Sequence, residues 1–206
     1  MEESSNPNNS KYDVIILGAS NFTGKYVLRE TLKFLNAPSS SPIQTLALAG
    51  RNPNKLLQAL AWASHPEPPP SLPILLAETS DPASLSLLAA STRLLLNCVG
   101  PFCLHDTPVV AACVESGCDY LDICGEPEFM ERMEAEYHER AVERGGLVVS
   151  ACGFDSGPAE LGVMFNSRNW VAAGGVPNRI EAYLSLGSEK MVVGNFGTFE
   201  STGRSE

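Results

Sequence analysis

Short apolar runs alternate with amphipathic stretches along most of the chain. Six runs rich in β-branched residues or leucine predict buried strands, over residues 12–18, 44–49, 74–77, 93–99, 119–123 and 147–151. The stretches between them place apolar residues at helical spacing and predict helices, over 24–35, from 53, from 82, over 107–116 and over 127–144. Strands that alternate with helices in this way favour an α/β fold with a parallel, doubly wound sheet.

The pattern changes after the sixth strand. A further helix is expected over 158–166, and residues 179–185 alternate polar and apolar side chains, which predicts a strand with one exposed face. We therefore expect one α/β domain over residues 11–177 and the truncated beginning of a second, α+β domain over 178–206. The polar residues 1–10 are expected to form a disordered tail.

Composition and charge argue against several classes of protein. The 206 residues are 44% hydrophobic, which is enough for a packed core, and the net charge of −10 disfavours nucleic-acid binding. No apolar run reaches the length of about 18 residues that a transmembrane helix needs. The N-terminal residues show no secretory or transit pattern, so the sequence itself predicts an intracellular, cytoplasmic protein. The six cysteines lack the paired spacing of a zinc site, and we expect no metal and mostly buried, reduced thiols.

A glycine motif joins the first predicted strand to the first predicted helix. Gly18 permits a tight turn, small side chains after it let the backbone approach phosphate oxygens, and Gly24 lets the helix pack closely on the sheet. Asn21 stands where the usual motif has a central glycine, and we expect it to adopt the left-handed backbone that asparagine tolerates. A tight turn without a ligand is the alternative. The candidate cofactor-binding residues here are Gly18, Ala19, Ser20, Asn21, Phe22, Thr23 and Gly24.

The end of the second predicted strand indicates which dinucleotide binds. NAD sites usually place an acidic residue there, whereas this chain has Gly50, Arg51 and Asn52. A guanidinium can pair with a ribose 2′-phosphate through two hydrogen bonds. Arg51 therefore favours NADP(H) over NAD(H), with an ordinary surface arginine as the alternative.

The end of the fourth predicted strand is expected to face the ribose and nicotinamide of the cofactor. Phe102 follows it, and packing beside the cofactor and packing in the core both remain open. Cys98 is expected to be an inert buried thiol, because no nearby base can be named. The candidate cofactor-binding residues here are Asn97, Cys98, Val99 and Gly100.

Together with residues 117–122, 125–126 and 153–156, these motifs resemble the saccharopine dehydrogenase-like oxidoreductases, a family that includes a mycobacterial enoyl reductase. The resemblance implies a Rossmann domain followed by a substrate domain. It also implies NAD(P)-dependent hydride transfer to or from an imine, enoyl or carbonyl group of an unidentified small molecule. A mitochondrial location and peripheral contact with membranes or lipid droplets are further expectations from the resemblance. A homo-oligomer is expected because so short a second domain would leave its predicted strand without partners, as an unpaired edge.

The segment Gly153–Gly157 matches a substrate-edge segment of saccharopine reductases. The resemblance makes Asp155 a weak catalytic candidate, and a helix N-cap is the alternative role for this residue. No catalytic acid or base is named. The competing hypothesis for the whole chain is a non-catalytic protein that binds NADP or presents an interaction surface.

Overall fold

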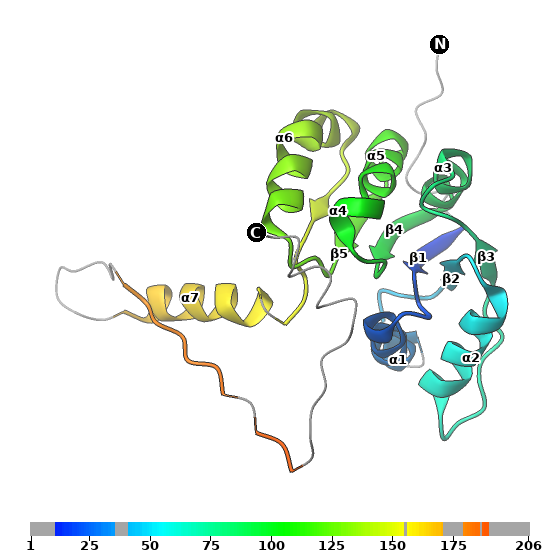
Figure 1. The fold of residues 1–206 in the computed structure, drawn as a ribbon, viewed down its shortest axis with the longest axis horizontal. Helices are drawn as coiled ribbons and strands as arrows, with labels where there is room; N and C mark the ends of the chain where they lie inside the picture. Colours follow the sequence, from blue (N-terminus) through cyan, green and yellow to red (C-terminus); the bar gives the residue numbers. More distant parts are fainter. Residues whose placement is uncertain (1–10, 36–40, 155, 171–178, 186, 190–206) are drawn as a thin grey trace.

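A parallel six-stranded sheet forms the centre of the structure, a computed structural model that describes residues 11–35, 41–154, 156–170, 179–185 and 187–189 (Figure 1). The strands lie in the order β3-β2-β1-β4-β5-β6. Their bounds are β1 Tyr12–Leu17, β2 Leu46–Gly50, β3 Ile74–Leu76, β4 Thr92–Asn97, β5 Asp119–Asp122 and β6 Val148–Val149. This order places the reversal point of the sheet between β1 and β4, and the predicted α/β, Rossmann-type fold class is confirmed.

Helices cover both faces of the sheet. On β1, Val14 and Ile16 point to the α1–α2 side, while Ile15 and Leu17 point to the side of α3, α5 and α6. Both faces of the strand are therefore buried, which explains its unbroken apolar sequence. The helix bounds are α1 Phe22–Leu35, α2 Pro53–Ser64, α3 Pro82–Ala90, α4 Phe102–His105, α5 Thr107–Ser116, α6 Pro127–Arg144 and α7 Gly157–Asn169.

Local capping chemistry sets several helix ends. The side-chain oxygen of Asn52 accepts a hydrogen bond at the start of α2, from the Lys55 amide at 3.1 Å, and Asp81 caps α3 in the same way. Gly117 and Gly145 end α5 and α6 in the left-handed conformation. The predicted bounds of these last two helices are therefore confirmed.

The elements differ from expectation in two places: one helix was missed, and one expected strand is wrong. The four-residue helix α4 was not expected, because one helical turn carries no periodic apolar signal. Residues 179–185 form no strand in the structure. Alternation of side chains describes one strand face, but a strand exists only with a hydrogen-bonding neighbour, and the described residues supply none there.

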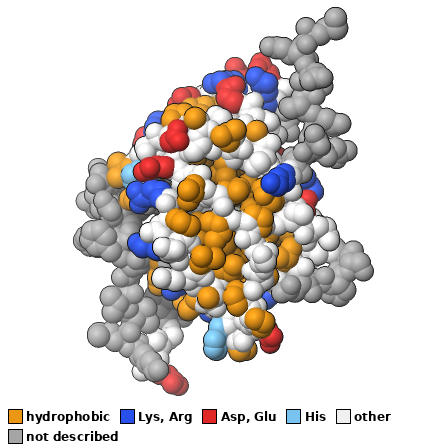
Figure 2. Space-filling view, turned by 90° about the vertical axis from the view of Figure 1, so that its right-hand side faces the viewer, with side chains coloured by type: hydrophobic (Ala, Val, Ile, Leu, Met, Phe, Trp, Pro, Cys, Tyr) orange, Lys and Arg blue, Asp and Glu red, His pale blue; other side chains and the backbone are white. Residues whose placement is uncertain are grey.

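Strand β3, which forms one outer edge of the sheet, is short and follows the proline-rich loop 66–73. Figure 2 shows the side of the molecule that carries this edge with α2 and α3, where apolar side chains gather. Leu57 on α2, Leu76 on β3 and Leu87 on α3 are exposed. Three strand residues, preceded directly by Pro73, leave little backbone for another strand to pair with. In the part of the chain that the structure describes, no helix is both long and apolar enough to cross a bilayer.

Helix α1 packs closely against the turn after β1 at Gly24. A Cβ atom there would overlap the Gly18 carbonyl oxygen and lie 3.1 Å from the Ala19 Cα. Both obstacles are backbone, which cannot rotate away. The expected role of Gly24 in close helix packing is confirmed.

We expect Gly24→Ala to destabilise the chain by about 1–3 kcal/mol, although alanine favours a helix, because the methyl group overpacks the β1–α1 turn. Gly162→Ala in α7 is the control, since a Cβ at Gly162 has no neighbour within 4 Å. Denaturant unfolding of both variants measures the difference. An unchanged midpoint for Gly24→Ala would contradict the packing argument.

Candidate cofactor site

The turn after β1 lies directly against the end of β4. Gly18 has φ +78°, and a Cβ added to it would lie 2.8 Å from Val99 Cγ2 and 3.0 Å from the Cys98 carbonyl carbon. Glycine is needed here for two reasons, the left-handed backbone and the close approach of the two chains. These two strand ends form the reversal point of the sheet, where open α/β folds bind their ligands.

Asn21 connects the turn to the neighbouring strand. Its Nδ2 donates a hydrogen bond of 3.0 Å to the Cys98 carbonyl oxygen, and its backbone N–H donates to the Gly18 carbonyl oxygen at 2.9 Å. Asn21 does not have a positive φ, so the expected left-handed backbone is wrong. Gly18 alone makes the left-handed turn, and the Asn21 amide holds that turn against β4.

The first turn of α1 opens toward this edge of the sheet. The first amides of a helix have no partner within the helix, and the helix dipole makes this end favourable for an anion. Ala19 is fully buried, whereas Asn21, Phe22 and Thr23 are exposed and Ser20 is half-buried. The exposed start of α1 is therefore the part of the turn that fits a pyrophosphate.

Arg51 lies at the carboxyl end of β2, next to that turn. Its Nη1 is 3.8 Å from Oε1 of Glu78, which follows the neighbouring strand β3. The sequence showed no acid at the end of β2, but the topology brings one from β3. Both side chains are largely exposed, so the pair is weak and leaves Arg51 able to bind a phosphate instead.

The polar side chains at the end of β4 belong to the interior. Asn97 is fully buried, and its Nδ2 donates to Asp106 Oδ1 at 2.8 Å and to the Tyr120 hydroxyl at 3.1 Å. Burial, with the charges of Asp122 and Asp106, raises the pKa of Cys98 to about 12, which agrees with an inert thiol.

Phe102 also belongs to the interior. It is buried with its ring centroid 6.0 Å from that of Phe129, so it packs in the core. Cofactor contacts by Asn97, Cys98, Val99 and Gly100 stay predictions, and contacts from the first two would come from their backbone.

The sequence analysis assigned no role to three buried carboxyl groups that lie below this edge, although two of them belong to the motifs of the resemblance: Asp106, Asp122 and Glu126. Burial raises the pKa of Asp106 to about 8, against a lowering contribution from its hydrogen bond with Asn97, and the charges of Asp122 and Glu126 raise it further. Its Oδ2 has no hydrogen-bond partner. The available signal was an acidic residue at the end of the buried strand β5, followed four residues later by another.

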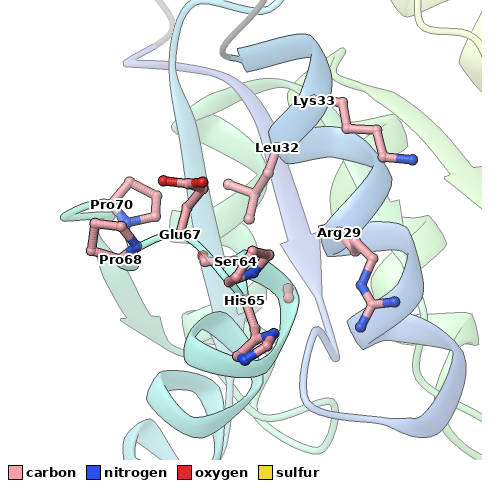
Figure 3. A pocket seen from close by; sticks show the side chains of 10 residues that line it. Arg29, Leu32, Lys33, Ser64, His65, Glu67, Pro68 and Pro70 are labelled. Atoms are coloured by element: carbon pink, nitrogen blue, oxygen red, sulfur yellow. The ribbon is translucent and has the colours of Figure 1, made fainter.

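A pocket of about 530 Å³ lies elsewhere, between the last turns of α1 and α2 and the proline-rich loop after α2 (Figure 3). Arg29, Lys33, His65 and Glu67 line it. Because these helices run back from the carboxyl edge, their last turns lie toward the opposite edge of the sheet. The pocket contains none of the predicted site residues. Asp155 lies outside the described residues, and the described residues include no cluster of three or more metal-ligating side chains.

The fold and these contacts agree with comparisons to known proteins. Residues 14–149 match the family model described as the saccharopine dehydrogenase NADP binding domain. The chain belongs to the saccharopine dehydrogenase-like family. NADP(H) is therefore its cofactor, as Arg51 predicted.

Relatives in this family are longer than this chain. An Arabidopsis thaliana protein named "probable mitochondrial saccharopine dehydrogenase-like oxidoreductase" is 68% identical over 92% of this chain and 42% of its own length. A Caenorhabditis elegans protein named "lipid droplet localized protein" is 37% identical over 86% of this chain and 40% of its own. The chain thus spans less than half of these relatives, and its own location stays a prediction.

The fold also matches a solved member of the wider group. Saccharopine dehydrogenase (L-Glu forming) from Saccharomyces cerevisiae superposes with a TM-score of 0.57 at 18% identity, over 76% of this chain and 31% of that one. At this identity the match supports the saccharopine dehydrogenase-like fold and nothing about substrate.

We expect Asn21→Gly to lower stability by about 1–2 kcal/mol and to weaken NADPH binding, because it removes the hydrogen bond to Cys98 and loosens the turn. The sequence alone predicted that Asn21→Gly would not weaken cofactor binding, because glycine adopts a positive φ at no cost and Asn21 was expected to have one. Ser20→Gly is the control, since it adds similar backbone freedom one residue earlier. Equal losses in both variants, measured by thermal unfolding and cofactor titration, would leave no role for the Asn21 amide.

The raised pKa of Asp106 predicts a pH-dependent stability. The folded state holds this proton up to a pH of about 8, whereas the unfolded chain releases it near its ordinary value of 3.8, so stability falls as pH rises between these values. Asp106→Asn keeps an acceptor for Asn97 and removes the titration. At pH 8 we expect the variant to be more stable than the unmodified chain, by a few kcal/mol at most in free energy of unfolding, and therefore to melt at a higher temperature. This difference in stability should become smaller toward pH 5.

Exposed Glu131→Gln serves as the control for that pH series, and its melting difference should stay constant across the range. If the difference in melting between Asp106→Asn and the unmodified chain instead widens as the pH falls, the surroundings stabilise the ionised carboxylate of Asp106, and the raised pKa is wrong.

Proposed function

We propose that this chain holds NADP(H) across the β1–β4 reversal point and serves hydride transfer to or from an imine, enoyl or carbonyl substrate. The observation that carries the proposal is the contact between the Gly18 turn and the end of β4. Through this contact the start of α1, an end that favours an anion, lies beside the end of β4, which in this proposal would border the second half of the cofactor. The family match supports the same cofactor.

Each half of the cofactor would be held by different elements. The α1 first turn binds the pyrophosphate through backbone amides, and Arg51 pairs with the 2′-phosphate after releasing Glu78. The nicotinamide half would lie over the loops that follow β4, β5 and β6. NADPH supplies a hydride when bound, and the protein orients the ring and the substrate toward each other.

The role of Arg51 is tested by cofactor preference. We expect Arg51→Ala to weaken NADPH binding by about 1–3 kcal/mol, tenfold or more, and to leave NADH binding nearly unchanged. Arg93→Ala is the control, because the largely exposed Arg93 also forms an ion pair, with the partly buried Asp13, but at the opposite edge of the sheet. Fluorescence titration with both cofactors measures the preference. Equal affinity of the unmodified chain for NADPH and NADH would overturn the assignment.

Hydride transfer is tested separately, by following NADPH absorbance with small imines, enals and ketones. Turnover that is lost in Arg51→Ala at low NADPH and restored at high NADPH supports the oxidoreductase. Tight NADPH binding without turnover of any of these substrates favours the competing function, a non-catalytic NADP-binding protein.

We also propose that the chain self-associates through α7. None of its described residues is buried, and Leu161 and Phe165, one turn apart, are 66% and 67% exposed. Glu160 lies in the first turn and Arg168 in the last. An antiparallel pair of these helices from two copies would bury the apolar side chains and bring each glutamate beside the partner's arginine.

The double variant Leu161→Glu and Phe165→Glu is expected to shift the chain toward monomer at concentrations where the unmodified chain is dimeric, as measured by light scattering. Leu87→Glu with Leu57→Glu, on the exposed side of α3 and α2, is the control. An unmodified chain that is monomeric at every concentration tested would refute the proposal.

A further inference from the structure

Two of the buried carboxyl groups hold the loops at the carboxyl edge of the sheet. Asp122 is the last residue of β5, the strand that lies between β4 and β6, and Glu126 is the N-cap residue of α6, four residues later. One reaches toward the loop after β4 and the other toward the loop after β6. Their hydrogen bonds go mainly to backbone amides, so they fix the path of the chain rather than the orientation of single side chains.

Glu126 reaches the loop after β4. It is 4% exposed, and its Oε1 and Oε2 accept hydrogen bonds from the amides of Phe102, at 3.0 Å, and Cys103, at 2.8 Å. These amides begin α4, directly after the segment 99–101. Hydrogen bonds from backbone N–H groups to a carboxylate are strong, and burial strengthens them further. Glu126 thus sets where segment 99–101 leaves β4.

Asp122 reaches the loop after β6. It is fully buried, its Oδ1 accepts from the Ala151 amide at 2.9 Å, and its Oδ2 accepts from the Ser150 hydroxyl at 2.9 Å. Its carbonyl oxygen also accepts from the Cys152 amide at 2.8 Å.

Asp122 binds a strained part of the chain. Ala151 has φ 58°, a left-handed conformation that costs an L-residue about 1–2 kcal/mol. Strained backbone of this kind persists where surrounding contacts impose it, and it concentrates at functional sites.

We infer that Asp122 and Glu126 are positioning residues for the nicotinamide half of NADP(H). This inference rests on the proposed placement of the cofactor. The adenosine half depends on the β1–α1 turn and Arg51, whereas the β4, β5 and β6 loops that the two carboxylates hold border the other half. Loss of either carboxylate would therefore displace the loops that border the nicotinamide half. It would leave binding of the adenosine half unchanged.

The test compares two probes on the full chain. NADPH contains both halves, and adenosine 2′,5′-bisphosphate contains only the adenosine half with its 2′-phosphate. We expect Glu126→Gln and Asp122→Asn each to weaken NADPH binding tenfold or more and to change binding of the bisphosphate less than twofold. The change in nicotinamide fluorescence on binding should also be lost, a signal that a general loss of stability would not remove selectively.

Two further variants keep the test decisive. Ser150→Ala leaves both carboxylates in place and removes one bond to Asp122, so it should fold and weaken NADPH two- to fivefold without affecting the bisphosphate. Asp119→Asn is the matched control, because Asp119 bonds the Leu147 amide at 2.9 Å from the opposite end of β5. It should bind both probes normally.

The outcomes separate the two proposals. If the unmodified chain binds neither probe, the proposed function fails. If it binds both, and the variants weaken both alike or leave NADPH binding unchanged, the cofactor site stands and the positioning role of Asp122 and Glu126 is wrong. Selective loss of NADPH binding in Ser150→Ala supports that role even if the carboxylate variants do not fold.

Discussion

The carboxyl edge of the sheet depends on the missing Cβ atoms of Gly18 and Gly24. One lets the turn after β1 touch the end of β4, and the other lets α1 begin directly on that turn. Without both contacts, the helix end would move away from the reversal point of the sheet and its amides would no longer meet a ligand there. Asn21 then joins the two strand ends by a hydrogen bond of 3.0 Å, so the turn after β1 and the adjacent loop form one unit.

The second constraint is electrostatic. The described interior contains Asp106, Asp122 and Glu126, and an acidic group is buried only where hydrogen bonds or protonation compensate for lost water. Asp122 and Glu126 are compensated mainly by backbone amides, whereas Asp106 has one oxygen without a partner and a pKa raised to about 8. The three groups therefore have different roles: two hold loops, and one holds a proton.

The sequence predicted what depends on neighbours along the chain. The sheet, the helices that end at Gly117 and Gly145, and the glycine motif all follow from local periodicity and local backbone preference. It failed where the outcome depends on distant residues. The role of Asn21 depends on a carbonyl group 77 residues away, and the burial of Asn97 depends on Tyr120 and Asp106. Strand 179–185 failed for the same reason, since side-chain alternation says nothing about a pairing neighbour.

The loops at this edge are already bonded to the protein before any ligand arrives. Segment 98–103 is held by Asn21 and Glu126, and segment 150–152 is held by Asp122. Ordering a flexible loop on binding would cost conformational entropy, which subtracts directly from affinity. Here that entropy is lost during folding instead, so little of the interaction energy with a dinucleotide is spent on arranging the site. The buried carboxylates thus keep the loops of the site in place before the dinucleotide binds, and the cost of ordering these loops lowers the stability of the fold instead of the affinity.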